Sequence, residues 1–307
     1  MAKNFVPELI KFIETFDKME FKTDRAMSEL TSFKIGGPAD IVISPPSLQS
    51  FCAVLDYVSE RGVKHTVLGK GSNVLFADAG YRGAVITTGN LSGLTVDEES
   101  KIIVAECGVS LTYCASAAKK ASVAGMEFTY GIPGSCGGAV YMNAGAYGGE
   151  MADIVVASTY YDTVTRSVAT MERENHAFGY RTSAFKTHPS RVILSSAFQL
   201  TAGDRDAITQ KMDGFMEQRI SKQPLEYPSA GSVFKRFPGY YTAQMIDESG
   251  LKGKSVGGAQ VSEKHAGFIV NKGNATAADV LALIDVIREA VMTKFGVEIE
   301  CEIIYID

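Results

Sequence analysis

The sequence predicts a mixed fold of helices and strands that is divided into more than one domain. Three observations support this: a length of 307 residues, an alternation of helical and strand periodicity along the chain, and a change of composition after Thr201. A chain of this length is typical of about two domains and can bury a core without disulfides or metals. Hydrophobic residues make up 46% and charged residues 21%, as in ordinary globular proteins.

The first part of the chain alternates short strands with amphipathic helices. Leu9, Ile10, Ile13 and Phe16 have the spacing of one helix face. Gly62 follows the second helix as a typical C-terminal stop. In order, we expect a helix over 7–18, a strand over 39–44, a helix over 47–61, strands over 64–68, 84–88 and 101–107, and a helix capped by Ser110 that ends near Gly125.

The remainder predicts two long strands and then a separate C-terminal region. The strands cover 153–162 and 191–200, with an irregular, charged stretch between them. We place a domain boundary near residue 201. Beyond it we expect helices over 204–221, 242–249 and 276–295, and strands over 266–270 and 297–306.

Charge and cysteine usage limit the possible partners and location. The net charge of -5 argues against nucleic acid as a partner, although a local basic cluster could still hold a small anionic ligand. The five cysteines are odd in number and lack C-x-x-C spacing, so we expect reduced thiols and a cytoplasmic protein. The start, MAKNFVPELI, lacks the apolar core of a signal peptide, and no run reaches the length of a membrane helix. No residues have metal-ligand spacing, so no metal is expected.

Glycines give the first chemical signal. The 30 glycines cluster in FKIGGPA (33–39), LGKGSNVL (68–75) and GIPGSCGGAVYMNAGAYGG (131–149). Glycine lets the backbone approach a ligand closely, and successive N–H groups in such loops form anion sites. A single loop of this kind is more often a tight turn, but three dense loops favour a phosphate-bearing ligand. None matches the P-loop or the Rossmann pattern.

Five motifs resemble one enzyme family. LGKGSNVL (68–75), GIPGSCGGAVYMNAGAYGGE (131–150), YRTSAFK (180–186), PSAGSVFKR (228–236) and EKHAGFIVN (263–271) occur in the order found in the UDP-N-acetylenolpyruvoylglucosamine reductases. The resemblance runs from about Thr31 to the end of the sequence. The short spacing from Arg181 to Ser232 is similar to the subgroup that lacks a tyrosine-bearing loop insertion.

This resemblance implies an α+β fold of the vanillyl-alcohol oxidase and p-cresol methylhydroxylase type. Residues 1–90 and 91–200 would form two FAD-binding subdomains, the first completed by the C-terminal strand, and residues 201–307 a C-terminal substrate domain. The implied activity is the reduction of UDP-N-acetylglucosamine enolpyruvate with NADPH, through non-covalently bound FAD, in peptidoglycan precursor synthesis.

The implied catalytic residues are Arg181, Ser232 and Glu302. Reduction of an enolpyruvyl group leaves negative charge beside a carboxylate, which needs a cation and a proton donor. An arginine fork pairs with a carboxylate in a bidentate manner. The resemblance assigns proton donation to Ser232, for which Lys235 or Arg236 could supply nearby positive charge. Glu302 is the last acid before its strand face turns apolar, so we expect a partly buried carboxylate.

The remaining site residues are also implied by the resemblance. Arg219 and Lys222 would grip the diphosphate of the sugar nucleotide, although a solvated helix end explains them equally well. The other expected substrate contacts are Tyr180 and Arg236. The expected cofactor contacts are Gly69, Lys70, Gly71, Ser72, Asn73, Gly131, Ile132, Pro133, Gly134, Ser135, Asn143, Gly145 and Ala146.

Two other functions are considered. One is an oxidase of the same flavin fold; such enzymes often attach FAD covalently, and no histidine falls between residues 69 and 149. The other is a non-catalytic nucleotide-binding module, which would not need the set Arg181, Ser232 and Glu302.

Overall fold

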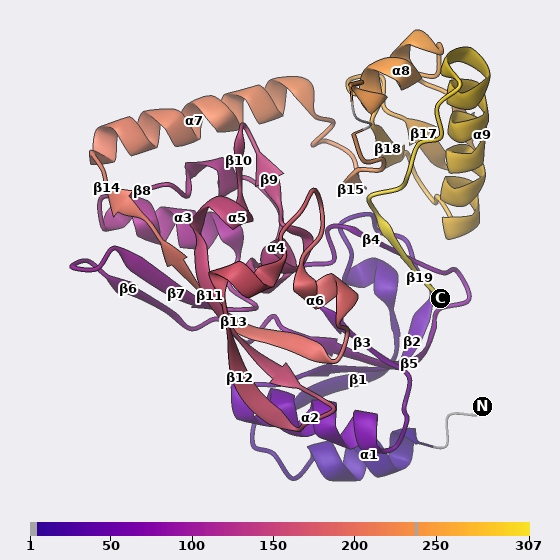
Figure 1. Cartoon of the computed structure of the whole chain (residues 1–307). Helices are drawn as coiled ribbons and strands as arrows, with labels where there is room; N and C mark the ends of the chain where they lie inside the picture. Colours follow the sequence, from indigo (N-terminus) through magenta and orange to yellow (C-terminus); the bar gives the residue numbers. More distant parts are fainter. Residues whose placement is uncertain (1–4, 237–238) are drawn as a thin grey trace. The chain divides into compact units, whose positions relative to one another are not determined.

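The computed structural model describes residues 5–236 and 239–307, and Figure 1 shows the course of the chain. The first four residues of MAKNFVPELI therefore lie outside the described residues. Two compact units are present. The first contains the chain up to Lys22 together with Val42–Lys70 and Gly83–Arg219, and the second contains Thr23–Ile41, Gly71–Arg82 and Ile220–Asp307. The division into 1–90, 91–200 and 201–307 stays a prediction.

A five-stranded antiparallel sheet forms part of the first unit. Its order is β12-β11-β13-β7-β6. The predicted strands 153–162 and 191–200 are confirmed as neighbours β11 and β13, whereas the stretch between them, expected to be irregular, contains a strand of its own. The strands are β6 (Leu94–Asp97), β7 (Ile102–Glu106), β11 (Val155–Asp162), β12 (Ser167–Glu172) and β13 (Arg191–Gln199).

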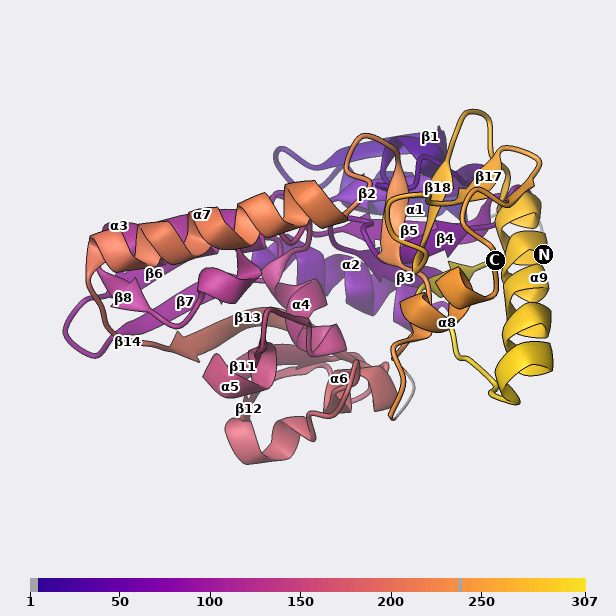
Figure 2. The same cartoon turned by 90° about the horizontal axis from the view of Figure 1, so that it is seen from above.

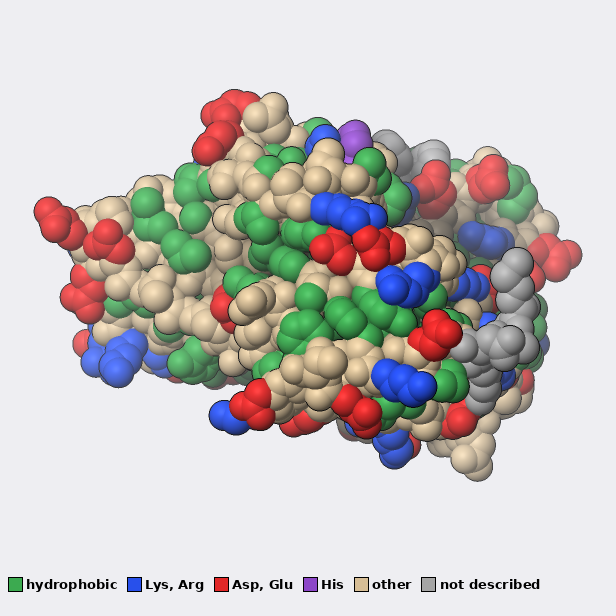
Figure 3. Space-filling view, turned by 90° about the horizontal axis from the view of Figure 1, so that it is seen from below, with side chains coloured by type: hydrophobic (Ala, Val, Ile, Leu, Met, Phe, Trp, Pro, Cys, Tyr) green, Lys and Arg blue, Asp and Glu red, His purple; other side chains and the backbone are tan. Residues whose placement is uncertain are grey.

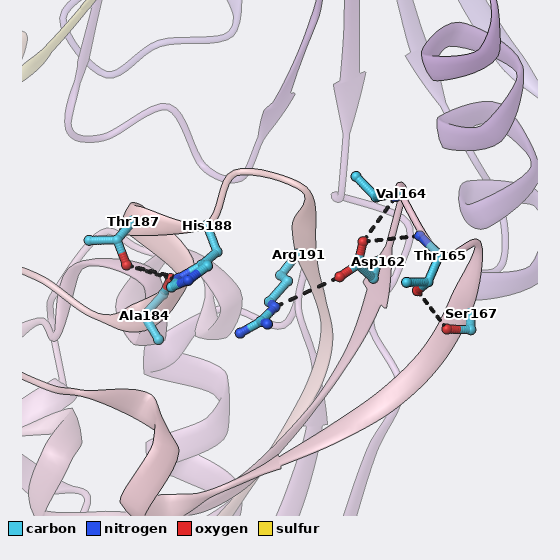
Figure 4. Close-up of polar contacts among 8 residues, drawn as sticks. All are labelled: Asp162, Val164, Thr165, Ser167, Ala184, Thr187, His188 and Arg191. Carbon is cyan, nitrogen blue, oxygen red and sulfur yellow. Dashed lines mark hydrogen bonds and ion pairs between the residues drawn. The ribbon is translucent and has the colours of Figure 1, made fainter.

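Asp162 organises the ends of β11 and β13 (Figure 4). Its carboxylate accepts hydrogen bonds from the backbone N–H groups of Val164, at 2.9 Å, and Thr165, which shape the turn into β12. The other carboxylate oxygen lies 3.8 Å from Nε of Arg191, its register partner on β13. These contacts hold together the two ends of the segment that carries Arg181.

The helices of the first unit begin where the sequence provides caps. Ser47 and Ser50 form a capping box before α2, and the Ser110 hydroxyl accepts from the N–H of Tyr113 at the start of α3. The helices are α1 (Val6–Ile13), α2 (Leu48–Glu60), α3 (Leu111–Lys120), α4 (Cys136–Met142), α5 (Met151–Ile154), α6 (Ala184–Thr187) and α7 (Arg205–Lys222, whose last turn enters the second unit), with short 3-10 turns η2 (Glu127–Thr129) and η3 (Arg173–His176).

The helix expected to end near Gly125 ends earlier, at Lys120. Ser122 has a left-handed backbone (φ 54°), which no continuing helix allows. Val123–Ala124 then forms β8, which pairs with β14 (Thr201–Ala202). The prediction was therefore wrong by about one helical turn, because tertiary pairing takes over the chain after the last lysine.

Helix α7 packs on α3 (Figures 1 and 2). Ile208 and Met212 form a small buried cluster with Ala115 of α3, and they are one helical turn apart on the same face. The rest of α7 is mostly polar, so a narrow apolar stripe positions this helix.

A four-stranded sheet with the order β1-β2-β5-β3 includes strands that pass from one unit to the other. Strand β3 pairs with β5 in parallel. The predicted strands 39–44, 64–68 and 84–88 are confirmed. The first strand was missed because its sequence, EFKTDRA, is almost wholly exposed and lacks apolar alternation. The strands are β1 (Glu20–Ala26), β2 (Pro38–Ser44), β3 (His65–Leu68) and β5 (Tyr81–Thr87).

The second unit packs α9 against an antiparallel sheet of order β15-β18-β17-β16. The larger α9 side chains that enter this core lie on one face of the helix, and each such aliphatic side chain contributes about 1.5–3 kcal/mol when fully buried. They are Val280, Leu283, Ile284, Ile287 and Val291. Phe33, Ile35 and Leu75, from early in the sequence, belong to the same core. The elements are η1 (Met27–Glu29), β15 (Ser229–Ser232), α8 (Thr242–Glu248), β16 (Ser255–Val256), β17 (Ala259–Val261), β18 (Phe268–Asn271) and α9 (Ala277–Phe295).

The N-terminus of α9 has two separate caps. Thr276 forms a capping box with Asp279. In addition, both carboxylate oxygens of Asp78 accept hydrogen bonds, from the N–H of Ala277 at 2.7 Å and from that of Ala278 at 3.0 Å. The carboxylate lies where the helix dipole favours negative charge.

The strand expected over 297–306 is regular only at its end. β19 (Ile304–Ile306) pairs in parallel with β4 (Val74–Phe76). Cys301 instead makes an isolated bridge with Phe234, so the chain changes partner between residues 301 and 304 and cannot remain one regular strand. Ile299 and Ile303 are buried as the alternation predicts, but Tyr305, expected on the same face, is exposed, so the burial pattern changes in β19.

On the face that Figure 3 shows, basic side chains stand next to acidic ones around scattered apolar groups. Within the described part of the chain, no helix is both long enough and apolar enough to cross a membrane.

Candidate functional site

The loop Gly69–Asn73 carries backbone N–H groups that the protein itself does not use. Among the described residues, none of the five N–H groups from Gly69 to Asn73 donates a hydrogen bond. Gly71 has φ +61°, and a Cβ there would lie 2.3 Å from the carbonyl oxygen of Leu30, so no larger residue fits. Free N–H groups on a glycine-bearing loop fit an anionic ligand such as a phosphate.

The second glycine-rich loop meets the first within the first unit. A Cβ on Gly69 would lie 2.4 Å from Oγ of Ser135, so the two segments are in direct contact. Gly131 also requires glycine, because its φ is +82° and Met216 of α7 lies against it. This loop, 131–135, therefore lies between the first loop and α7.

The backbone N–H groups in the first turn of α4 already donate hydrogen bonds to acceptors of the protein itself. The N–H of Cys136 donates to the carbonyl of Val109, and that of Gly137 to the carbonyl of Cys107. The Ser135 hydroxyl accepts from Gly138 at 3.4 Å. The anion-binding capacity therefore lies in the Gly69–Asn73 loop rather than at the start of this helix.

The FKIGGPA cluster has a packing role. A Cβ on Gly37 would lie 2.1 Å from the carbonyl oxygen of Asp78, and one on Gly36 would lie 2.7 Å from Cβ of Phe76. Gly37 also exchanges backbone hydrogen bonds with Met27 and Ala77. Close backbone packing explains these glycines without a ligand.

Arg181 is held on the end of α4. Its guanidinium donates from Nη1 to the carbonyl of Asn143, at 3.3 Å, and from Nη2 to the carbonyl of Gly145, at 3.1 Å. The backbone of Arg181 is left-handed, with φ 56°, inside a turn closed by reciprocal hydrogen bonds between Gly179 and Thr182. An unfavourable backbone conformation held by surrounding contacts is common at functional sites.

Asn143 joins three segments around Arg181. It ends α4 in the left-handed conformation, and its side chain is fully buried. Nδ2 donates to the carbonyl of Gly179 at 3.0 Å, and Oδ1 accepts from the N–H of Ala152 at 2.9 Å. Every polar group of this residue is thus bonded to protein, which gives it an architectural role. Contact between Asn143 and a cofactor stays a prediction.

Ser232 and Glu302 lie on adjacent segments of the second unit. The N–H of Glu302 donates to the carbonyl of Val233, the residue after Ser232, at 2.7 Å. Asn73 is hydrogen-bonded to the segment that carries Glu302. Its Nδ2 donates to the carbonyl of Glu302 at 3.3 Å, and its carbonyl accepts from the N–H of Ile304. The structure therefore brings the end of the first glycine loop beside Glu302. Glu302 is partly buried, as expected.

The basic residues near Ser232 have partners of their own. Nζ of Lys235 lies 2.7 Å from a carboxylate oxygen of Glu300, and this contact lowers the pKa of the Glu300 carboxyl. The Arg236 guanidinium lies 5.6 Å from the ring centre of Tyr241. Tyr180 is exposed, with the Arg181 guanidinium 5.1 Å from its ring centre.

Arg219 and Lys222 differ in burial and in the unit to which they belong, although they are one turn apart on α7. Arg219 belongs to the first unit and is packed against Gly131, whereas Lys222 belongs to the second and is exposed. Nη1 of Arg219 is buried and has no hydrogen-bond partner among the described residues.

Comparison with known proteins identifies both parts of the chain. The family model for an FAD binding domain matches residues 39–166, and the model for the C-terminal domain of UDP-N-acetylenolpyruvoylglucosamine reductase matches residues 223–306. A curated reductase of that name from Clostridium novyi (strain NT) is 44% identical over 95% of this chain and 94% of its own. The chain belongs to the UDP-N-acetylenolpyruvoylglucosamine reductase family.

Other members of this family also match almost the whole chain. The curated reductase from Geobacillus kaustophilus (strain HTA426) is 43% identical over 95% of both chains. The crystal structure of the reductase from Thermus caldophilus is 32% identical, covers 94% of this chain and 100% of its own, and has a TM-score of 0.79. The mixed α+β fold with an FAD-binding domain is thereby confirmed.

The residues fit the cofactor of this reductase family. The N–H groups at Gly69–Asn73 that no described residue uses suit the diphosphate of a dinucleotide, and the buried Nη1 of Arg219 has no acceptor within residues 5–236 and 239–307. Ser183 was not predicted as a site residue, yet its hydroxyl donates to the carbonyl of Tyr141 at 2.8 Å and ties the Arg181 turn to α4. The only signal was its place inside the YRTSAFK motif.

Proposed function

We propose that this protein reduces UDP-N-acetylglucosamine enolpyruvate with NADPH, through non-covalently bound FAD, to give UDP-N-acetylmuramate for peptidoglycan synthesis. The observation that carries this is the match of whole-length reductases across both the FAD-binding and the C-terminal domain. The five free cysteines support the proposal of a cytoplasmic enzyme.

Bound FAD supplies the hydride chemistry. For the chain's own residues, we assign charge stabilisation to Arg181, because a guanidinium stays protonated and its planar fork matches a carboxylate. Its two hydrogen bonds to backbone carbonyls fix the orientation of the guanidinium before any substrate arrives. Pre-organised donors of this kind are a main source of catalytic stabilisation.

We assign proton donation to Ser232 and polarisation of the substrate carboxylate to Glu302. The Ser232 hydroxyl donates to the carbonyl of Phe234 at 3.3 Å, a long contact that leaves the hydroxyl free to turn toward another acceptor. The hydrogen bond between Glu302 and Val233 keeps the two segments in register.

An anaerobic two-step titration tests the function. NADPH alone should bleach the flavin spectrum, and the enolpyruvyl sugar nucleotide should then restore it. Recovery with oxygen but not with the sugar would instead indicate an oxidase, and no bleaching at all would indicate a binding module. Acid precipitation should release FAD into the supernatant; flavin that stays with the protein would refute non-covalent binding.

A further inference from the structure

His176 is a buried histidine at the end of the 3-10 turn η3, shortly before Arg181 in the chain. Its Nδ1 lies 3.0 Å from the carbonyl oxygen of Glu172, and a carbonyl oxygen can only accept, so this nitrogen carries a proton. Burial lowers the pKa of the ring, so the imidazole is neutral at neutral pH. The second ring nitrogen, Nε2, is therefore a hydrogen-bond acceptor.

Two serines connect this ring to the five-stranded sheet. Nε2 accepts a hydrogen bond from the Ser158 hydroxyl at 2.9 Å, and Oγ of Ser158 lies 2.9 Å from Oγ of Ser196. Because the hydrogen of Ser158 points at the ring, Ser196 is the donor in the second bond. Both serines are buried, and they are register partners on β11 and β13. The His176 ring is thus bonded to two neighbouring strands of the sheet.

The same ring contacts the chain on both sides of the Arg181 turn. Phe178 stacks on the His176 ring, with centroids 4.9 Å apart and planes 18° apart. Phe185 meets the ring edge-on, at a centroid distance of 5.7 Å and an angle of 70°. The left-handed backbone of Arg181 lies between these two phenylalanines in the sequence. Both ends of this unfavourable turn are therefore packed on one buried ring.

We propose that His176 is a positioning residue for Arg181, because its ring, hydrogen-bonded to the sheet through Ser158, holds both ends of the turn that carries the guanidinium. This inference rests on the role that the proposed function gives to Arg181. Asn143 holds the same turn from the end of α4, through Gly179. The turn is thus fixed by α4 and by the sheet, all within the first unit. A displacement of about 1 Å at a reacting group can cost about 10²-fold in rate.

Two substitutions of different severity test this inference. Ser158→Ala removes the donor to Nε2 and leaves the ring in place, whereas His176→Leu removes the ring itself. Stopped flow on the full-length holoenzyme measures the two flavin half-reactions separately. At saturating NADPH, flavin reduction should stay within about twofold of wild type. Reoxidation by the enolpyruvyl sugar nucleotide should slow about 3- to 10-fold in Ser158→Ala and about 10- to 100-fold in His176→Leu.

A double-mutant cycle tests whether the effect passes through Arg181. In an Arg181→Ala background, the further change Ser158→Ala should slow reoxidation by less than about twofold, because the positioned group is already gone. Slowing by the same factor in both backgrounds would overturn the inference.

Ser47→Ala is the control for a general loss of stability in the first unit. It removes the N-cap of α2 and should lower the unfolding free energy by about 1 kcal/mol. Both half-reactions should stay within about twofold of wild type in this variant. Selective slowing of the sugar half-reaction in Ser47→Ala would mean that lost stability alone produces the effect, and the inference would fail.

The remaining outcomes separate this inference from the proposed function. If folded Ser158→Ala and His176→Leu slowed both half-reactions alike, or neither, His176 would have a packing role only, although the wild-type enzyme would still turn over. A wild-type flavin that NADPH bleaches and the sugar nucleotide does not reoxidise would overturn the proposed function itself, and this inference with it.

Discussion

Replacement of Asn143 by alanine should destabilise the first unit strongly. The change removes the acceptor for the N–H of Ala152 and the donor for the carbonyl of Gly179. Each partner left unpaired costs about 1–3 kcal/mol. Alanine in the left-handed conformation adds about 1 kcal/mol, because asparagine tolerates that region better. The expected total loss of unfolding free energy is roughly 3–7 kcal/mol.

Two variants divide this total into its parts. Asn143→Gly loses the same hydrogen bonds but accepts a positive φ, so it should be about 1 kcal/mol less destabilising than Asn143→Ala. Asn274 also has a positive φ, of 55°, and is exposed, so Asn274→Ala should show the backbone cost alone. Urea unfolding of each variant, with and without FAD, gives the midpoint and slope for the comparison.

The enzymatic consequence follows from Arg181. Its guanidinium donates to the Asn143 carbonyl, and its turn is tied to the Asn143 side chain through Gly179. Asn143→Gly should therefore raise the KM for the sugar nucleotide even at temperatures where the variant is fully folded. If Asn143→Ala were no more destabilising than Asn274→Ala, or if Asn143→Gly had wild-type kinetics, Asn143 would not position Arg181 and our account of this turn would be wrong.

Three further predictions concern other parts of the chain. Ser232→Ala should leave bleaching of the flavin by NADPH nearly normal and slow recovery with the sugar by roughly 10²–10⁴-fold, measured by stopped flow; equal slowing of both steps would contradict proton donation by this hydroxyl. Asp78→Ala should lower the unfolding free energy by about 1–2 kcal/mol, since two N–H groups of α9 lose their acceptor; an unchanged urea midpoint would show that Thr276 alone caps the helix. Burial lowers the pKa of His176 from 6.5, so the unfolded chain takes up a proton that the native protein excludes, and stability should fall as pH drops below about 6.5; the same pH slope in His176→Asn would assign the effect to another group.

Helix boundaries were predictable where a single capping residue determines them. Ser47, Ser110 and Thr276 begin α2, α3 and α9, because each hydroxyl accepts a backbone N–H of the first turn. Gly296 ends α9 in the left-handed conformation. Both kinds of cap are local effects, so the type of the capping residue is enough to predict where the helix begins or ends.

Features that depend on distant partners were not predictable. The segment 297–306 alternates as a strand should, but its partner changes from Phe234 to β4 part-way along. The glycines of FKIGGPA looked like ligand glycines because composition does not reveal that the chain at Phe76–Asp78 fills the space beside them. For the same reason nothing in the sequence shows that residues 23–41 and 71–82 share a unit with residues 220–307.

The candidate site was predictable as a set of motifs and not as an arrangement. Arg181, Ser232 and Glu302 could be identified from their motifs, but the groups that accept the hydrogen bonds of Arg181 are backbone carbonyls, which every residue has. The pairing of Arg219 with Lys222 rested on adjacency along a helix. Burial separates them, because only Arg219 faces a glycine that leaves it room.

The parallel pairing of β19 with β4 has a consequence for synthesis of the protein on the ribosome. Val74 leaves the ribosome far ahead of Ile304, its register partner. At translation rates of about 5–20 residues per second, the earlier strand waits roughly 10–45 s for the later one. Phe33, Ile35 and Leu75 wait similarly for the apolar face of α9. During that interval the nascent chain presents apolar surface with no partner of its own, which makes these early segments natural ones for a ribosome-associated chaperone to cover.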